Sequence, residues 1–268
     1  MKKQMRLKTL CVLTATMLFT LVSCDKEPTE YRPELPPLES LVMDFSDFSS
    51  QPEGVKSSES YVNFVLAYTT VSYWSARAFL VSALPVAAYT EALSQSPEYL
   101  GDNVWEWSFN FTFNTQTYLV TLTGTRLNNE EFSMEMVISP ASTPEEKVKW
   151  FDGVIRYDHT SADWNLYMDG QVVLEVAWNK DFETEDADLT YTYVEPDKEE
   201  TGSYIMWEHR PEEVYDAAYT ISMSDGMTNI EWNLTSIEGR IKSMGFYQDE
   251  NWHCWVSLAN GLADIACE

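Results

Sequence analysis

Residues 104–113 read VWEWSFNFTF, and this stretch decides the fold. Large apolar side chains occupy every second position, at Trp105, Trp107, Phe109, Phe111 and Phe113. Because successive side chains of a β-strand point to opposite faces of the sheet, the alternation predicts a strand with one buried face and one face in water.

The same two-residue period continues toward the end of the chain. It recurs in residues 118–122 and 132–138, and Asp169-Gly170 is a two-residue hairpin turn between two further apolar runs. About eleven strands are expected in all. Those after the turn cover residues 171–178, 189–194, 203–207, 217–223, 229–234, 240–247 and 252–258.

The links between these strands predict how they pair. They are short and polar, and no long helical crossover separates the strands, so neighbours should run antiparallel. The predicted fold class is mainly β with a small α part. We expect an antiparallel meander that forms a half-open barrel or a strongly curved sheet, covered by N-terminal helices.

The segment before the meander has helical spacing. Apolar residues step by three or four between Phe64 and Val81, and Pro85 should end or kink the helix. A second short helix is expected at residues 86–93. A transmembrane helix is the alternative interpretation, but Arg77 and several hydroxyl side chains argue against it.

Residues 1–30 carry targeting information. A basic start precedes an apolar core from Leu10 to Val22, which is typical of a secretory signal and too short to span a bilayer. The run Leu21-Val22-Ser23-Cys24 resembles a bacterial lipobox. That resemblance implies that Cys24 is acylated and becomes the mature N-terminus, because buried acyl chains hold a protein at a membrane surface. An ordinary signal with an incidental cysteine is the alternative.

Three parts of the chain follow from these patterns. Residues 1–23 are the signal peptide, residues 24–55 are a lipidated, flexible tether that contains several prolines, and residues 56–268 form a single domain. Within the domain we expect a helical segment at residues 56–98 and the antiparallel meander at residues 101–268.

The chain is strongly acidic, with 17 Lys and Arg against 43 Asp and Glu and a formal net charge of −26. Removal of residues 1–23 takes away four cations and no acid, which brings the net charge to about −30. Such a surface repels phosphate backbones, so nucleic acid is not expected as a partner. The many aromatic residues indicate a substantial core and not a disordered acidic tail.

Two of the four cysteines remain for the folded domain. Cys11 leaves with the signal, and Cys24 takes lipid. Cys254 and Cys267 are then an even pair in an oxidising compartment, and they are expected to form a disulfide. Two free buried thiols are the alternative.

No sequence pattern indicates a metal site, a cofactor or a catalytic centre. His159, His209 and His253 lie far apart and lack metal-ligand spacing. The acidic loop at residues 181–188 could hold calcium, but a solvated hairpin loop is the simpler interpretation. There is no nucleophile motif, although a pair of catalytic carboxylates cannot be recognised in so acidic a chain. A protein that is not an enzyme is therefore the expectation.

Tryptophan is unusually frequent, with ten residues. Most of them must pack in the core. Trp105 and Trp107 share one strand face, whereas Trp252 and Trp255 fall on opposite faces, so one of the latter two should look outward. These four are the candidate ligand-binding residues, because an indole can stack on a sugar ring or line an apolar cavity.

These features together suggest a function. The lipobox, the acidic residues Asp25 and Glu27, and the Trp-rich strands resemble those of lipobox-bearing surface lipoproteins of Bacteroidetes. In architecture alone, the meander resembles the half-barrels of periplasmic lipoprotein carriers, which implies a cavity for a hydrophobic ligand.

We therefore expect a lipid-anchored, non-enzymatic lipoprotein of the outer membrane, periplasmic or surface-exposed, that binds an apolar or amphiphilic ligand in a β-sheet cavity. Two alternatives stay open. One is a surface glycan-binding or adhesion accessory, suggested by the tryptophans. The other is a structural protein that binds another envelope protein.

Overall fold

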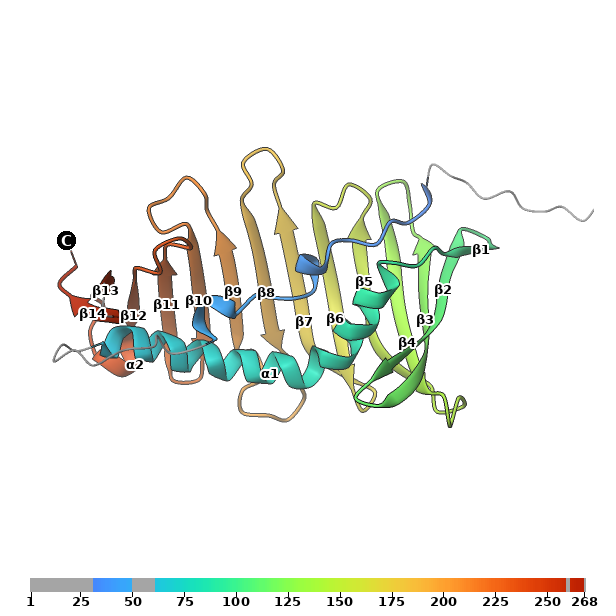
Figure 1. Ribbon diagram of the computed structural model, residues 1–268, viewed down its shortest axis with the longest axis horizontal. Helices are drawn as coiled ribbons and strands as arrows, with labels where there is room; N and C mark the ends of the chain where they lie inside the picture. The colour runs from blue at the N-terminus through green and yellow to red at the C-terminus, as the bar shows by residue number, and fades with distance from the viewer. Residues whose placement is uncertain (1–30, 50–60, 259–260, 268) are drawn as a thin grey trace, which may run out of the picture.

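In the part of the chain that the structure describes, fourteen strands form one open antiparallel sheet. The computed structural model describes residues 31–49, 61–258 and 261–267. Each strand pairs with its neighbours in the chain, so the order across the sheet is β1 to β14, with β1 and β14 at opposite edges (Figure 1). The predicted fold class, an antiparallel meander that is not a closed barrel, is confirmed.

The strands are β1 (Glu98–Gly101), β2 (Val104–Phe113), β3 (Gln116–Arg126), β4 (Glu131–Pro140), β5 (Val148–Arg156), β6 (Ser161–Met168), β7 (Gln171–Lys180), β8 (Ala187–Tyr193), β9 (Tyr204–His209), β10 (Ala217–Met223), β11 (Gly226–Trp232), β12 (Gly239–Ser243), β13 (His253–Leu258) and β14 (Gly261–Ile265). The short edge strands β1 and β14 were not expected from sequence, because four or five residues are too few to establish a period. The predicted strand at 240–247 ends early, since its last part forms the helix α2 (Met244–Tyr247).

A single long helix, α1 (Val62–Ala92), crosses the sheet on one face (Figure 1). It continues through Pro85, and the short helix expected at 86–93 is its last part. Pro85 removes one helical hydrogen bond. Buried side chains on both sides of it, including Val81 and Tyr89, pack against the sheet and hold the helix together. Among the described residues, no helix combines the length and the apolarity needed to cross a membrane.

Residues 31–49, which we call the strap, correct the prediction of a flexible tether at 24–55. The strap runs across the same face of the sheet as α1 and contains two short 3-10 helices, η2 (Leu38–Ser40) and η3 (Ser46–Phe48) (Figure 1). Leu41, Met43 and Phe48 are buried, at 0%, 4% and 1% exposure. Because the strap fills the sheet face beside α1, it is part of the core.

Tyrosine and tryptophan side chains of the sheet bind the strap backbone. The Trp164 indole donates to the Ser40 carbonyl at 2.9 Å. The Tyr191 hydroxyl donates to the Leu41 carbonyl at 2.9 Å and accepts from the Met43 amide at 2.8 Å. Most of the strap has no regular secondary structure, so its buried backbone groups lack partners within the strap. These side-chain bonds satisfy them.

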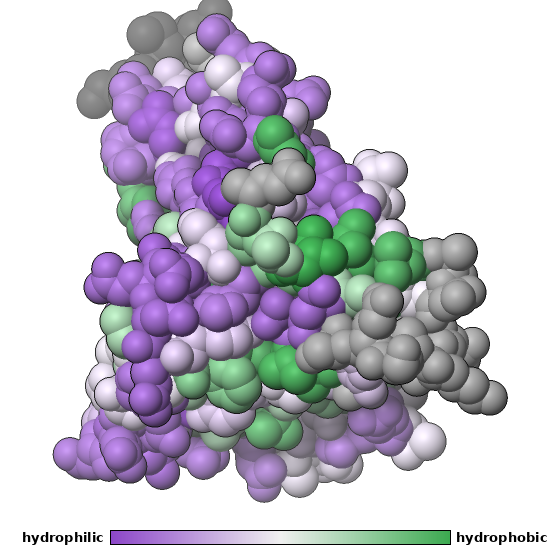
Figure 2. Space-filling view, turned by 90° about the vertical axis from the view of Figure 1, so that its left-hand side faces the viewer, coloured by the Kyte–Doolittle hydropathy of each residue, from purple (hydrophilic) through white to green (hydrophobic). Residues whose placement is uncertain are grey.

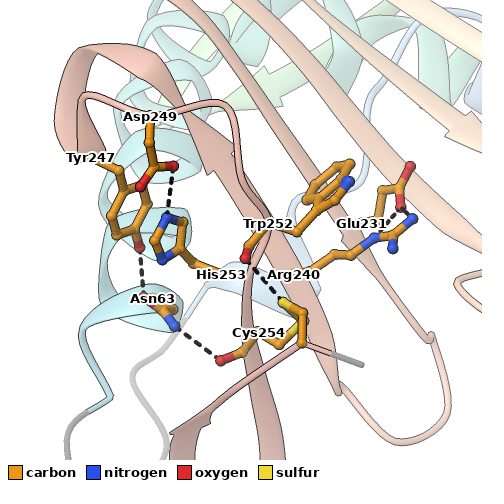
Figure 3. The surroundings of a disulfide bond; sticks show 9 residues. Asn63, Glu231, Arg240, Tyr247, Asp249, Trp252, His253 and Cys254 are labelled. Carbon is orange, nitrogen blue, oxygen red and sulfur yellow. Dashed lines mark hydrogen bonds and ion pairs between the residues drawn. A yellow bond between two sulfur atoms is a disulfide. The ribbon is translucent and has the colours of Figure 1, made fainter.

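The C-terminal strands fix the start of α1 (Figure 3). The Asp264 carboxylate of β14 accepts hydrogen bonds from the Val62 and Asn63 amides at 2.9 and 3.1 Å, which caps the helix. Asn63 Nδ2 donates to the Cys254 carbonyl at 2.9 Å, and the Tyr247 hydroxyl donates to Asn63 Oδ1 at 2.6 Å. Cys254 and Cys267 form a disulfide, in agreement with the expected pairing.

The β14 end of the sheet also carries exposed apolar side chains. Phe246, Leu258 and Ile265 are 53%, 46% and 48% exposed. Figure 2 views the molecule from this end and shows hydrophobic residues gathered between hydrophilic ones. Shortness limits the aggregation hazard of an open sheet edge, and β14 has only five residues.

Glycines opposite tryptophans allow the large rings to lie flat on the sheet. Gly153 of β5 pairs with Trp164 of β6. A Cβ atom at Gly153 would lie 2.5 Å from the Trp164 ring and 2.5 Å from the Asp163 carbonyl oxygen. Replacement of Gly153 by alanine is therefore expected to lower the free energy of unfolding by about 2 kcal/mol.

A second glycine provides the control for this prediction. Gly124 pairs with Trp105, but its added Cβ would lie 3.2 Å from Pro33 and 3.3 Å from the Trp107 ring. These side-chain atoms can move by a few tenths of an ångström. Gly124→Ala should therefore lower the free energy of unfolding by less than about 1 kcal/mol. Urea unfolding of both variants measures the difference, and equal losses would contradict the proposed clash at Gly153.

Candidate functional site

An apolar pocket of about 290 Å³ lies between the middle of α1 and the ends of β6, β7 and β8. We call it the α1 pocket. Its walls are Trp74, Arg77, Ala78, Leu80, Val81, Met168, Val173, Leu174, Tyr191, Tyr193 and Glu195. A water molecule takes about 30 Å³ in the liquid, so the pocket has room for roughly ten non-hydrogen atoms. That volume lies at the lower end of the range for small-ligand sites.

A β-bulge creates the sheet side of the α1 pocket. In the β6–β7 ladder, Leu166 pairs with Leu174 and Tyr167 pairs with Val172, which leaves Val173 as an extra residue. The bulge turns Val173 to the same side as Leu174, and both side chains are buried at 3% exposure. Two successive side chains of β7 thus face α1, whereas in a regular strand only one of two successive side chains would do so.

Trp74, on the helix side of the pocket, has a buried donor without a partner among the described residues. Trp74 is 2% exposed, and its Nε1 atom has no hydrogen-bond partner among the described residues. Burial of an N–H group without an acceptor costs free energy, and most buried polar groups in proteins are paired. The Trp74 N–H therefore lies buried without an acceptor, in a side chain that lines a mostly apolar pocket.

Charged groups at one end of the pocket are already paired with each other. The Arg77 guanidinium lies over the Tyr193 ring at 4.0 Å and is 3.7 Å from Glu200. Lys198 is 3.3 Å from the Glu195 carboxylate, which also accepts a hydrogen bond from the Tyr193 hydroxyl. Burial, followed by the hydrogen bond to Glu195, raises the pKa of Tyr193 to about 12.

Exposed apolar side chains of α1 adjoin the pocket. Leu80, which lines it, is 74% exposed, and the neighbouring Phe79 is 66% exposed. Between Val62 and Thr90 the only charged residue of the helix is Arg77, which is unusual in so acidic a chain. This absence of charge was the sequence signal that could have indicated a site on α1.

Three of the four candidate tryptophans lie in the core. Trp105, Trp107 and Trp255 are at most 2% exposed, and none of them lines the α1 pocket. They pack on the sheet face that α1 and the strap cover, so a ligand at the surface cannot reach them. The predicted ligand contacts of these three residues are thereby corrected to core packing.

Trp252 differs from the other three. It is half-buried just before β13, and the Arg240 guanidinium lies 4.3 Å from its ring centroid. Figure 3 shows the two side chains beside Glu231, whose carboxylate is 2.5 Å from Arg240. This indole face is thus already covered by a cation of the same chain, and the structure does not bring the four tryptophans together.

The opposite face of the sheet has an open hollow of about 490 Å³ with polar and apolar lining residues, which we call the outer trough. Glu135, Asp152, Asn165, Glu175 and Thr192 follow one another across β4 to β8 in direct cross-strand register and line it.

A polar network is built around one carboxylate of the outer trough. Asp152 accepts hydrogen bonds from Lys149, Asn165 and Tyr167 at 2.7–2.8 Å. Partial burial raises the pKa of Asp152, but these bonds outweigh that effect and hold the pKa below its ordinary value. The carboxylate therefore stays ionised at neutral pH.

The structure adds no metal site to this picture. Across residues 31–49, 61–258 and 261–267, no three His, Cys, Asp or Glu side chains converge as ligands. In the acidic loop at 181–188, Asp181 accepts bonds from the Glu183 and Thr184 amides, and Asp186 accepts one from the Thr184 hydroxyl. These oxygens stabilise the turn itself, as in an ordinary hairpin loop.

The predicted lipidation site, Cys24, lies outside the described residues. So do the predicted signal peptide and residues 24–30 of the predicted tether. Comparisons with known proteins provide no further assignment: no family model matches the chain, and neither the curated proteins nor the solved structures contain a match.

Proposed function

We propose that this chain is a lipid-anchored, non-enzymatic lipoprotein of the outer membrane that binds a small apolar or amphiphilic ligand in the α1 pocket. The observation that supports the proposal is the pocket itself, a mostly apolar space of about 290 Å³ between α1 and the sheet. The lipobox resemblance at Cys24 supports the membrane anchor.

The space available limits the size of the proposed ligand. A half-barrel carrier would hold its cargo against the whole inner face of the sheet. Here the strap and α1 occupy that face, and residues such as Leu41 and Ala88 are fully buried there. The space that is left suits a molecule of roughly ten non-hydrogen atoms.

A probe of that size tests the proposal. We expect ethylbenzene, which has eight non-hydrogen atoms, to bind the wild-type protein, as measured by calorimetry. Met168 lines the pocket and is 37% exposed, so Met168→Trp should fill the space and weaken binding at least tenfold. The matched control is Met227→Trp in β11, a 48% exposed position outside the pocket, which should bind as the wild type does.

Two results would count against the α1 pocket. Absence of ethylbenzene binding to the wild type would remove the proposed function. Equal binding to Met168→Trp and Met227→Trp would place the ligand elsewhere. Native mass spectrometry of protein purified from its own cells adds an independent check, because a ligand-binding protein should retain extra mass.

The outer trough favours a second candidate function, the binding of a surface glycan. Carboxylate, amide and hydroxyl groups in one cross-strand row are the partners that sugar hydroxyls require. On a glycan array, Glu175→Ala should reduce the signal at least fivefold. Glu106→Ala on β2, outside the trough, is the matched control and should retain it. An array without signal for the wild type would exclude this candidate.

A further inference from the structure

We infer that the exposed side of α1 rests on the surface of a lipid bilayer and inserts Phe79 and Leu80 among the lipids. The inference rests on the proposed function, because it needs the lipid anchor proposed at Cys24, and it adds which face of the domain turns toward the membrane. Three features carry it: the apolar side of α1, the short link to the anchor, and the acidic composition of the other surface near that link.

One side of α1 is apolar and uncovered. Tyr73, Ala76 and Leu80 are spaced by three and four residues, so they lie on one side of the helix, with Phe79 next to them. We call these four exposed residues the α1 surface; Tyr73, Phe79 and Leu80 are 39%, 66% and 74% exposed. The sheet covers only the opposite side of α1 (Figure 1). Exposed apolar patches of this kind mark contact sites for proteins or membranes.

The charge of α1 is small and already paired. Between Val62 and Thr90 the only charged residue of the helix is Arg77. Its guanidinium lies over the Tyr193 ring at 4.0 Å and is 3.7 Å from the Glu200 carboxylate. Contact with lipid therefore removes apolar groups from water, while this one cation keeps its partner at the level of the headgroups.

The link to the proposed anchor is short. Cys24 and Tyr31 are seven positions apart, and a chain of that length spans at most about 25 Å. Tyr31 is fixed to the sheet, since its carbonyl accepts a hydrogen bond from the Tyr157 hydroxyl at 2.8 Å. A small domain is roughly 30 Å across, so the link holds one side of this domain close to the bilayer. The strap continues from Tyr31 along the face that carries α1, where the Tyr89 hydroxyl donates to the Pro36 carbonyl at 2.8 Å.

The other surface near Tyr31 is the end of the sheet where β3 joins β4, β5 joins β6 and β7 joins β8. Carboxylates are frequent in these three loops. They are Glu130, Asp158, Asp181, Glu183, Glu185 and Asp186. Carboxylates lose hydration at a bilayer and are repelled by anionic headgroups, so this end of the sheet should face water. The α1 surface is then the face that the anchor brings to the lipid.

Three matched tryptophan reporters test this orientation. Phe79→Trp places an indole on the α1 surface, Phe182→Trp places one in the β7–β8 loop, and Phe246→Trp places one at the β14 end. The three phenylalanines are 66%, 57% and 53% exposed, so each replacement is tolerated at a surface position. Each mature lipoprotein is reconstituted into phosphatidylcholine vesicles with brominated acyl chains, which quench an indole on contact.

The measured quantity is the fluorescence that each variant adds to that of the wild type. For Phe79→Trp it should fall at least twofold when brominated lipid replaces ordinary lipid, because the indole lies among the acyl chains. For Phe182→Trp and Phe246→Trp it should stay the same. Quenching at either of these two positions in place of Phe79→Trp would overturn the inference.

A second measurement leaves the α1 surface unchanged. Hydroxyl radicals oxidise exposed side chains, and mass spectrometry locates the products. Phe79 and Leu80 should be oxidised several-fold less in the vesicle-bound lipoprotein than in the mature Cys24→Ser protein in solution, whereas Phe182 should be oxidised equally in both. Equal oxidation of Phe79 in the two samples would contradict contact with lipid.

The outcomes separate this inference from the proposed function. If mass spectrometry finds no acyl group on Cys24, the proposed membrane anchor fails and the inference fails with it. If Cys24 is acylated and Phe79→Trp is not quenched, only the present inference fails. Protection of Phe79 in cell envelopes without quenching in pure lipid would assign the α1 surface to a partner protein and would also overturn the inference.

Discussion

Replacement of Phe48 by alanine is expected to lower the free energy of unfolding by about 4 kcal/mol, the largest effect of any single substitution considered. Phe48 is the place where strap, helix and sheet meet. The centroid of its ring lies 5.6 Å from that of Phe64 in α1, 5.0 Å from that of Trp232 in β11 and 6.1 Å from that of Tyr219 in β10. Removal of the ring leaves a cavity bounded by all three layers, which cannot close it by moving together.

Phe45 provides a matched control. It belongs to the same strap and is half-buried, and its ring stacks on Tyr219 with the ring centroids 6.1 Å apart. Phe45→Ala should cost about 1–2 kcal/mol, because water already reaches part of the ring. Urea unfolding followed by tryptophan fluorescence measures both variants. If Phe48→Ala lowered the free energy of unfolding no more than Phe45→Ala does, the strap would be a surface segment and not part of the core.

Loss of the disulfide is expected to produce the second largest effect. Cys254 and Cys267 are 13 residues apart, and closure of a loop of about that length contributes roughly 3 kcal/mol in the chain-entropy description. The double variant Cys254→Ala with Cys267→Ala should therefore unfold at a lower urea concentration. Reduction of the wild-type protein with dithiothreitol should give the same shift.

The disulfide also has a local consequence. It ties the end of β14 to β13, and Asp264 of β14 caps the first amides of α1. Hydrogen exchange at the Val62 and Asn63 amides should accelerate in the double variant more than exchange in the middle of β4. Unchanged exchange at the helix start, together with an unchanged unfolding midpoint, would show that the bond contributes nothing to this corner.

The period of two predicted the sheet because it depends only on neighbouring residues. The buried face of β2, with Trp105 and Trp107, is visible in any reading of VWEWSFNFTF. The strap could not be found in the same way. Leu41, Met43 and Phe48 follow no single period. Trp164, Tyr191 and Tyr219, which donate hydrogen bonds to the strap backbone, lie more than a hundred residues away. Long-range packing of an irregular segment leaves almost no local signature.

The α1 pocket was hidden for a related reason. The run Val172-Val173-Leu174 is apolar throughout, so alternation does not reveal which side chain is the extra one in the bulge. Likewise, Trp105, Trp107, Trp252 and Trp255 were predicted to contact a ligand. The sequence could not show that a glycine faces Trp105 and Trp164 across the ladder and makes room for the rings to pack inside.

The placement of the strap has a consequence for the order in which an emerging chain can fold. Strands of the meander pair with the strand made just before them, so the sheet can grow hairpin by hairpin as the polypeptide emerges. The strap and α1 emerge before the sheet. The partner of Leu41, Tyr191, follows 150 residues later, and the partner of Val62, Asp264, follows 202 residues later. The strap and α1 therefore remain without these partners until the far strands have been made, and they are the segments for which we expect chaperone protection.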